Sequence, residues 1–338
     1  MHRLWRLLKW LGFLILALPA GGAIYQQAGA LFDDFTLPPA VGRTVAVGGY
    51  GVHFVCSGAG KRTFVLDAGL GAWSAEWYRL QPMLAKMGRV CAYDRPGFGG
   101  SAYRGHAFDG VTAADELHAL LPAMGVAKPF VYVGHSLGAN FGEIYAARFP
   151  KDLEALILIE PGVPKDLLSN FDPISRETAL AMPATCGASC YAGWAAGALG
   201  VGRFIVHHVV TGAINLNDPA TLARYQADAS RSSAAATGAA YFAALPKTCF
   251  QDTDIANFGV LPILVLASAI APQGDPGEDM AAWRRRQLAY FRALAAKSAH
   301  GAGPMTIAGS THASMVMGSP AGQTAADIGA FLAGLAPR

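Results

Sequence analysis

The chain has 338 residues, of which 53% are hydrophobic and 14% are charged. This length and composition allow one large core, so we expect a single folded domain. The net charge of +3 is small for this size. Because no basic run is interleaved with aromatic residues, the sequence argues against a nucleic-acid partner.

Residues 1–30 are predicted to be a targeting segment, because three basic residues precede an uncharged apolar run at 10–25. The basic residues are Arg3, Arg6 and Lys9. The run predicts either an uncleaved membrane anchor or a signal peptide with a small-residue cleavage site at 28–30. An anchor would place the basic residues in the cytoplasm and the rest of the chain on the non-cytoplasmic side. The protein is therefore expected to be membrane-anchored or exported.

Residues 31–43 are expected to form a short polar linker into a domain at 44–338. In that domain, apolar runs of strand length alternate with helical patterns, which predicts an α/β fold: a mostly parallel eight-stranded sheet flanked by helices. The predicted strands are 44–47, 52–56, 63–66, 89–93, 130–133, 155–159, 263–267 and 305–308. The later runs are continuously apolar rather than alternating, which indicates strands covered on both faces.

Residues 163–257 are rich in alanine and are broken by proline and glycine, with no clear strand pattern. They predict a helical cap inserted between two strands of the sheet. Pockets favour the boundary between a rigid sheet and such an insert. Trp194, Phe204 and Tyr241 are therefore candidates for the wall of a substrate pocket.

Five cysteines bear on the redox environment. An exported chain meets oxidants, which favours a disulfide among Cys186, Cys190 and Cys249, but the sequence does not select the pair. Cys56 and Cys91 lie in apolar strand-like runs and are expected to be buried thiols. The close pair Cys186 and Cys190 is not accompanied by a second close pair of Cys or His at ligand spacing, so no metal site is expected. No other cofactor is expected.

The segment 134–138 has the sequence Gly-His-Ser-Leu-Gly and lies between a buried strand and a helical pattern. A serine on such a tight turn projects its hydroxyl out of the sheet, so Ser136 is the candidate nucleophile. Gly134 and Gly138 are needed because a β-carbon at either position would strike the neighbouring backbone. His135 is expected to line or support the site, because adjacent residues on a sharp turn point apart.

With this motif in place, the chain resembles the α/β-hydrolase superfamily from about Val45 to its C-terminus, most weakly through the cap. Residues 64–71 are similar to the family's oxyanion loop, and residues 93–99 to the turn after its fourth strand. The resemblance implies that the base follows the last strand, where His312 lies. It also implies an oxyanion hole formed by the backbone N–H groups of Leu137 and Leu70.

Two carboxylates compete for the role of the acid that orients His312. Glu160 directly follows the predicted strand 155–159, which would deliver it rigidly to the carboxyl edge of the sheet. Asp275 lies after strand 263–267, where the commoner family pattern places the acid, but in a longer loop that contains proline. We favour Glu160 at this point and keep Asp275 as the alternative.

The resulting expectation is a serine hydrolase that cleaves carboxylic esters of a hydrophobic small molecule through an acyl-enzyme. Amide cleavage and acyl transfer by the same triad remain open. A second alternative is a non-catalytic binding module on the same fold. The sequence does not determine the oligomeric state.

Overall fold

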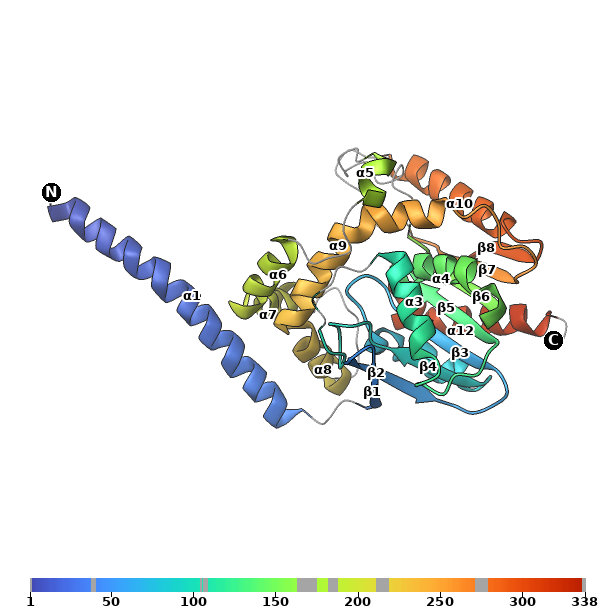
Figure 1. Ribbon diagram of the computed structural model, residues 1–338, viewed down its shortest axis with the longest axis horizontal. Coiled ribbons are helices and arrows are strands. Elements are labelled where there is room, and N and C mark those ends of the chain that lie inside the picture. The colour runs from blue at the N-terminus through green and yellow to red at the C-terminus, as the bar shows by residue number, and fades with distance from the viewer. Residues whose placement is uncertain are drawn as a thin grey trace.

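The computed structural model describes residues 2–37, 41–103, 105, 109–162, 175–181, 188–210, 219–270 and 279–335. Eight strands form one sheet in the order β1-β2-β4-β3-β5-β6-β7-β8, with helices on both sides (Figure 1). Strand β2 runs antiparallel to β1 and β4, and the other neighbouring pairs are parallel. The predicted α/β fold is therefore confirmed.

Each predicted strand corresponds to an observed one, with ends that differ by a few residues. The strands are β1 (Arg43–Val47), β2 (Tyr50–Ser57), β3 (Thr63–Asp67), β4 (Arg89–Tyr93), β5 (Phe130–His135), β6 (Leu153–Ile159), β7 (Ile263–Ser268) and β8 (Gly301–Ile307). The carboxyl ends of the parallel strands lie at one edge of the sheet, which is where α/β folds place their ligands.

The continuous apolar runs are buried on both faces of the sheet. In β6, Leu156 and Leu158 pack into one hydrophobic cluster, whereas Ile157 and Ile159 pack into a second cluster on the opposite face. The first cluster includes residues of α3 (Gly110–Leu120), α4 (Leu137–Arg148) and α10 (Met280–Ala296). The second includes residues of α2 (Leu80–Leu84), α11 (Ser314–Met317) and α12 (Ala321–Ala333). This two-sided burial explains why the runs do not alternate.

The described part of the predicted cap, between β6 and β7, is helical. Its elements are α5 (Arg176–Ala181), α6 (Ala188–Ala198), α7 (Val201–Ile205), the π-helical turn η4 (Val206–Val210), α8 (Pro219–Ala229) and α9 (Ser232–Thr253). Side chains of α8 and α9, including Tyr225 and Tyr241, join Trp73 and Leu137 of the sheet domain in one apolar cluster. The cap therefore packs on the carboxyl edge of the sheet.

The N-terminal segment forms a single helix, α1 (His2–Thr36), whose first half projects away from the body of the molecule (Figure 1). Residues 9–36 of this helix are long and apolar enough to cross a membrane. The expected linker at 31–43 is wrong in its first part, because residues 31–36 continue the helix. In this last part of α1, the carboxylate of Asp33 pairs with Arg203 of the cap, 2.7 Å away.

The expectation of thiols at Cys56 and Cys91 is also wrong, because the two residues form a disulfide. They are direct partners across the antiparallel pair β2 and β4, with their Cα atoms 4.1 Å apart. Strand β3 separates β2 from β4 in sequence but not in the sheet, so the sequence did not reveal this proximity. In the cap, Cys190 is disulfide-bonded and Cys249 is a buried thiol. Cys186 lies outside the described residues.

Candidate active site

Ser136 occupies the sharp turn between β5 and α4. Its backbone has φ 54° and ψ −123°, a conformation that is strained for a residue with a β-carbon. The Ser136 amide donates a hydrogen bond to the carbonyl of Ile159 in β6, with a donor–acceptor distance of 3.0 Å. The neighbouring strand thus holds the turn that presents the hydroxyl at the carboxyl edge of the sheet.

The two glycines of the motif are required by close backbone contacts. A β-carbon at Gly138 would lie 2.2 Å from the carbonyl oxygen of Asp67, and one at Gly134 would lie 2.4 Å from the carbonyl oxygen of Gly138. Both distances are far below van der Waals contact. The predicted reason for glycine at these positions is therefore confirmed.

The loop after β3 lies directly against the nucleophile turn. A β-carbon added to Gly69 would be 3.4 Å from the β-carbon of Ser136. Leu70 follows Gly69, and Leu137 is the first residue of α4, so the Leu137 N–H belongs to the helix turn that lacks intrahelical acceptors. Both amides predicted for the oxyanion hole thus belong to segments that flank Ser136.

Arg95, in the turn after β4, fixes the conformation of this loop. Its buried guanidinium donates to the carbonyl of Ala68 at 2.6 Å and also to the carbonyl of Gly69 and the carboxylate of Asp67. Tyr132 and Tyr93 donate to the other oxygen of Asp67, at 2.6 and 2.9 Å. Burial raises the pKa of Asp67, although the positive charge of Arg95 opposes that shift.

His312 reaches the same edge of the sheet from the loop after β8. Its ring centroid lies 4.6 Å from that of His135, the residue before Ser136. The pKa of His312 is lowered to about 3, because the ring is removed from water and because the neighbouring His135 repels a second proton. His312 is therefore a neutral imidazole at physiological pH.

Glu76 is a site residue that the sequence analysis missed. It lies on the short 3-10 helix η1 (Ser74–Trp77), and its Oε2 accepts a hydrogen bond from the Gly69 N–H at 2.8 Å. Its Oε1 lies 2.6 Å from Nδ1 of His135. Its only sequence signal is a lone carboxylate between Trp73 and Trp77, both of which are buried.

His135 connects Glu76 to the His312 loop, because its Nε2 lies 3.0 Å from the carbonyl oxygen of His312. Both ring nitrogens thus face acceptors, which is satisfied only when both carry a proton. Burial alone would lower the pKa of His135, but the contact with Glu76 and the His312 carbonyl raise it above its ordinary value. His135 therefore joins Glu76 to the His312 loop, and its positive charge lowers the pKa of His312.

Glu160 follows β6 with a left-handed backbone, φ 43°, and its side chain is buried. Its carboxylate accepts hydrogen bonds from the backbone and hydroxyl of Ser268, from Arg284 and from Gln287, the last three at 3.1 Å. Among the described residues, His312 is not one of its partners. The alternative acid, Asp275, lies outside the described residues.

The three candidates for the pocket wall lie in different environments. Tyr241 is buried and stacks on Phe98, with ring centroids 5.7 Å apart, in the cluster that contains Leu137. Trp194 and Phe204, by contrast, are 53% and 56% exposed on the outer surface of the cap. Only Tyr241 of these three packs beside the nucleophile helix.

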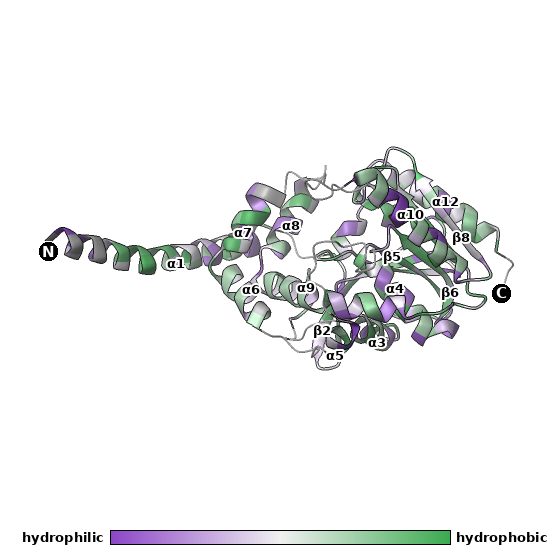
Figure 2. Ribbon diagram, turned by 90° about the horizontal axis from the view of Figure 1, so that it is seen from above, coloured by the Kyte–Doolittle hydropathy of each residue, from purple (hydrophilic) through white to green (hydrophobic). Residues whose placement is uncertain are grey.

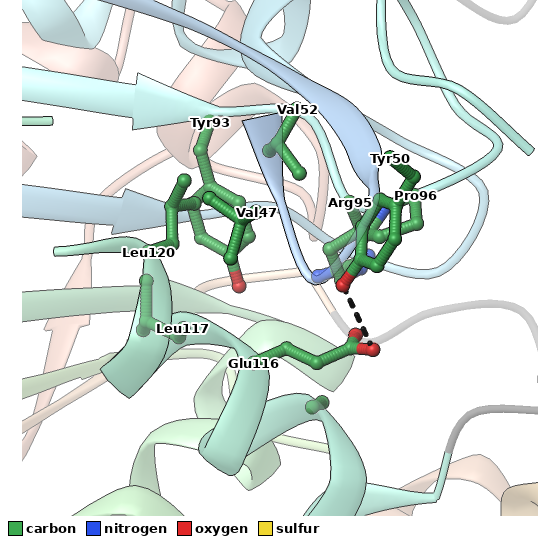
Figure 3. A pocket seen from close by; sticks show the side chains of 10 residues that line it. Val47, Tyr50, Val52, Tyr93, Arg95, Pro96, Glu116, Leu117 and Leu120 are labelled. Carbon is green, nitrogen blue, oxygen red and sulfur yellow. Dashed lines mark hydrogen bonds between the residues drawn. The ribbon is translucent and has the colours of Figure 1, made fainter. Parts of the chain in front are cut away.

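A separate pocket lies between β1, β2 and α3, behind Arg95 (Figure 3). Tyr50 donates a hydrogen bond to Glu116 across it at 3.2 Å. Its free volume of about 10 Å³ admits at most one water molecule, so it is not a substrate site. Within the described ranges, no group of three or more His, Cys, Asp or Glu side chains could hold a metal ion.

The sequence model of the family described as "alpha/beta hydrolase fold" matches residues 62–180, which carry β3 to β6 and the nucleophile turn. The uncharacterized protein YbdG of Bacillus subtilis is 27% identical over 175 residues, covering 50% of this chain and 54% of YbdG. The chain thus spans about half the length, or less, of the first curated relatives that it matches.

Two solved structures extend the likeness in fold beyond the matched segment. A thermophilic esterase from Thermogutta terrifontis superposes with a TM-score of 0.60 at 18% identity, covering 87% of this chain and 97% of the esterase. A membrane phospholipase A superposes with a TM-score of 0.57 at 21% identity, covering 99% of each chain. At these identities the likeness concerns the fold.

The strand order, the serine turn and the matched segment 62–180 show that this chain has an α/β-hydrolase fold. The esterase above and an enol-lactonase from Burkholderia xenovorans share this fold.

Proposed function

We propose that the protein is a serine hydrolase that cleaves carboxylic esters through an acyl-enzyme. The observation that carries this proposal is the strained conformation of Ser136, at the carboxyl edge of the sheet and against the Gly69 loop. Such strain persists where the surrounding structure maintains it and is common at catalytic nucleophiles.

In this mechanism the Ser136 hydroxyl attacks the ester carbonyl while His312 accepts its proton. His312 can accept the proton because its imidazole is neutral at physiological pH. The N–H groups of Leu137 and Leu70 would stabilise the oxyanion, and collapse of the tetrahedral intermediate would release the alcohol, which takes the proton from His312. Water, activated in turn by His312, then hydrolyses the acyl-serine ester.

The bonding of Glu160 supports a change in the choice of acid. Its carboxylate joins the ends of β6 and β7 to α10 through Ser268, Arg284 and Gln287. A carboxylate that accepts four hydrogen bonds elsewhere has little capacity left for an imidazole. We therefore propose Asp275 as the acid that orients His312, and a stabilising role for Glu160.

The N-terminal helix is proposed to remain attached as a membrane anchor. A signal peptidase cut at residues 28–30 would divide α1 within its contact with the cap, where Gln26 is buried and Gly29 lies against Arg203. The Cys56–Cys91 disulfide supports a non-cytoplasmic location for the body, because disulfides persist in oxidising compartments.

The proposal is tested with p-nitrophenyl esters of increasing acyl length and a fluorophosphonate probe, applied to the full chain in detergent. We expect wild type to hydrolyse the esters and to be labelled, and Ser136→Ala to lose labelling and about 10⁴-fold or more in kcat. An unlabelled wild type would support a binding module instead. Activity that survives in Ser136→Ala would refute the nucleophile.

The acid is identified by comparing Asp275→Asn with Glu160→Gln. We expect Asp275→Asn to lower kcat by about 10³- to 10⁴-fold with no loss of stability, because it leaves the tautomer of His312 undefined. Glu160→Gln should instead lower the melting temperature, because it leaves Arg284 without its carboxylate. The reverse pattern would return the role to Glu160.

A further inference from the structure

Helix α1 packs on the cap along one face. The contacts fall at Gly22, Gln26, Gly29 and Asp33, a spacing of four, three and four residues that places them on the same side of a helix. A β-carbon at Gly22 would lie 2.3 Å from the carbonyl oxygen of Leu199. The second half of α1 is thus fixed closely against the cap at the junction of α6 and α7.

Two polar contacts fix this packing further along the helix. Gln26 donates to the carbonyl of Ser230 at 2.9 Å, and Asp33 pairs with Arg203 at 2.7 Å. The side chain of Arg203 lies over Gly29, where a β-carbon would be 2.6 Å from its guanidinium. The depth of α1 in a membrane would therefore fix the depth of the cap.

The first half of α1 is exposed and apolar, and it extends beyond the body (Figures 1 and 2). Its exposed large side chains between residues 10 and 25 are Trp10, Leu11, Phe13, Leu14, Ile15, Leu16, Leu18, Ile24 and Tyr25. At 1.5 Å per residue this run spans about 24 Å, close to the roughly 30 Å of a bilayer's hydrocarbon core. Gly22, which meets the cap, lies in the last turn of the run. The α6–α7 junction would therefore lie at the outer boundary of the hydrocarbon.

The cap presents apolar side chains at that same level. We name as the cap patch the exposed residues of α6, α7 and their junction: Tyr191, Trp194, Leu199, Val201, Phe204 and Ile205. Tyr191 is 71% exposed, and Trp194 and Phe204 are more than half exposed. Trp and Tyr side chains are characteristic of the membrane–water boundary, because one end of each is apolar and the other can hydrogen-bond.

The residues around α1 become polar one to three turns beyond Gly22. There a cavity of about 340 Å³ between α1 and the cap is lined by Asp33, Asp34, Arg203, Arg224 and Arg231, among others. Residues 10–25 of α1 are uncharged, whereas this later part of the helix carries two aspartates. The cap and the helix thus change from apolar to charged at the same level, as a protein surface does where it leaves a bilayer.

We propose that the cap patch is a second membrane-contact surface, which lies in the outer interface of the bilayer that α1 crosses. This inference rests on the proposed anchor and on the proposed esterase activity. The cap connects the patch to the site through two contacts. Helix α7 contacts α8, and the ring of Tyr225 in α8 stacks on the ring of Trp73 beside the oxyanion loop, with ring centroids 4.5 Å apart. The substrate class that fits this arrangement is an acyl ester resident in the bilayer.

The contact is tested without catalysis by reconstituting the full chain in phosphatidylcholine vesicles, with or without lipid that carries a nitroxide near the carbonyl level. The fluorescence of Trp194 is obtained as the difference between wild type and Trp194→Phe. We expect the nitroxide to quench about half or more of this difference, as for a side chain 5–10 Å deep. An unquenched Trp194 overturns the membrane contact, whether or not the protein is an esterase.

The substrate class is tested with Trp194→Asp combined with Phe204→Asp, and with Val260→Asp as the matched control. Val260 is 64% exposed and precedes β7, at the opposite edge of the sheet from the site. The double variant should hydrolyse a vesicle-resident phosphatidylcholine at least about fivefold more slowly, with unchanged hydrolysis of soluble p-nitrophenyl acetate. Val260→Asp should change neither rate.

Equal rates for the double variant and wild type on the vesicle ester would overturn the substrate class, as would an equal loss in Val260→Asp. If wild type hydrolyses neither ester and resists fluorophosphonate, the proposed function fails. The quenching of Trp194 still decides the membrane contact in that case.

Discussion

At the scale of single residues, His135 and Glu76 link the two loops that flank Ser136. Glu76 holds the N–H of Gly69 in the oxyanion loop, and through His135 it reaches the backbone of the His312 loop. The protonated His135 also repels a proton from His312. We therefore propose these two as positioning residues, which would set the protonation of the proposed base His312.

Replacing Glu76 by Gln should remove the charge that keeps His135 protonated while preserving the size of the side chain. We expect a drop in kcat/KM of about 10-fold, typical for residues that orient catalytic groups. The pH profile should also change, because the pKa of His135 falls. Glu154→Gln, which removes a partly exposed carboxylate paired with Arg62, is the control and should leave the profile unchanged. A merely structural Glu76 would lower stability without moving the profile.

The low pKa of His312 has a consequence for stability. Between pH 3 and about 6.5 the unfolded chain binds a proton at His312 that the folded chain does not, so this group makes stability rise with pH across that window. His312→Gln should therefore be more stable than wild type by about 2 kcal/mol at pH 5, and the difference should vanish at pH 8. Urea unfolding at both pH values measures this, and an equal difference at both would contradict the assignment.

At the scale of elements, the junction of β5 and α4 depends on backbone contacts that leave no room for a side chain. We expect Gly138→Ala to abolish fluorophosphonate labelling and to lower stability by about 2 kcal/mol or more, because its β-carbon would strike the carbonyl of Asp67. Labelling at the wild-type rate in Gly138→Ala would contradict this account of the turn.

Gly322 in α12 provides the control for that substitution. It lies in a helix, and a β-carbon there would meet no atom within 4 Å. Gly322→Ala should therefore stabilise the protein by about 0.5–1 kcal/mol and leave labelling unchanged.

At the scale of the whole molecule, the disulfide, the exposed helix α1 and the cap patch are consistent with one location. Disulfides persist in oxidising compartments. Helices α1, α6 and α7, which carry exposed apolar side chains, lie at one end of the molecule (Figure 2). The proposed placement of the body on the outer side of a membrane agrees with both observations.

Removing the disulfide with Cys56→Ser and Cys91→Ser together should destabilise the body by about 4 kcal/mol, from the loop-closure entropy of the 35-residue separation. The denaturant midpoint measures the loss. Cys249→Ser, which affects a buried thiol outside any disulfide, should cost much less. An unchanged midpoint in the double variant would show that the cysteines are not bonded in the native protein.

The sequence by itself determined the eight strands, the serine turn with its two glycines, and the apolar N-terminal segment. These features depend on local patterns: continuous apolar runs, a Gly-x-Ser-x-Gly spacing and a run without charge. Residues 134–138 are informative alone because the turn that they form is made within five positions.

Only the tertiary structure decided which distant residues meet. The pairing of β2 with β4 brought Cys56 to Cys91, and the packing of η1 under the site brought Glu76 to His135. The bonding of Glu160 to α10 likewise became visible only once β6 and β7 lay side by side. Such contacts follow from the order of strands and the direction of side chains, which no local stretch of sequence encodes.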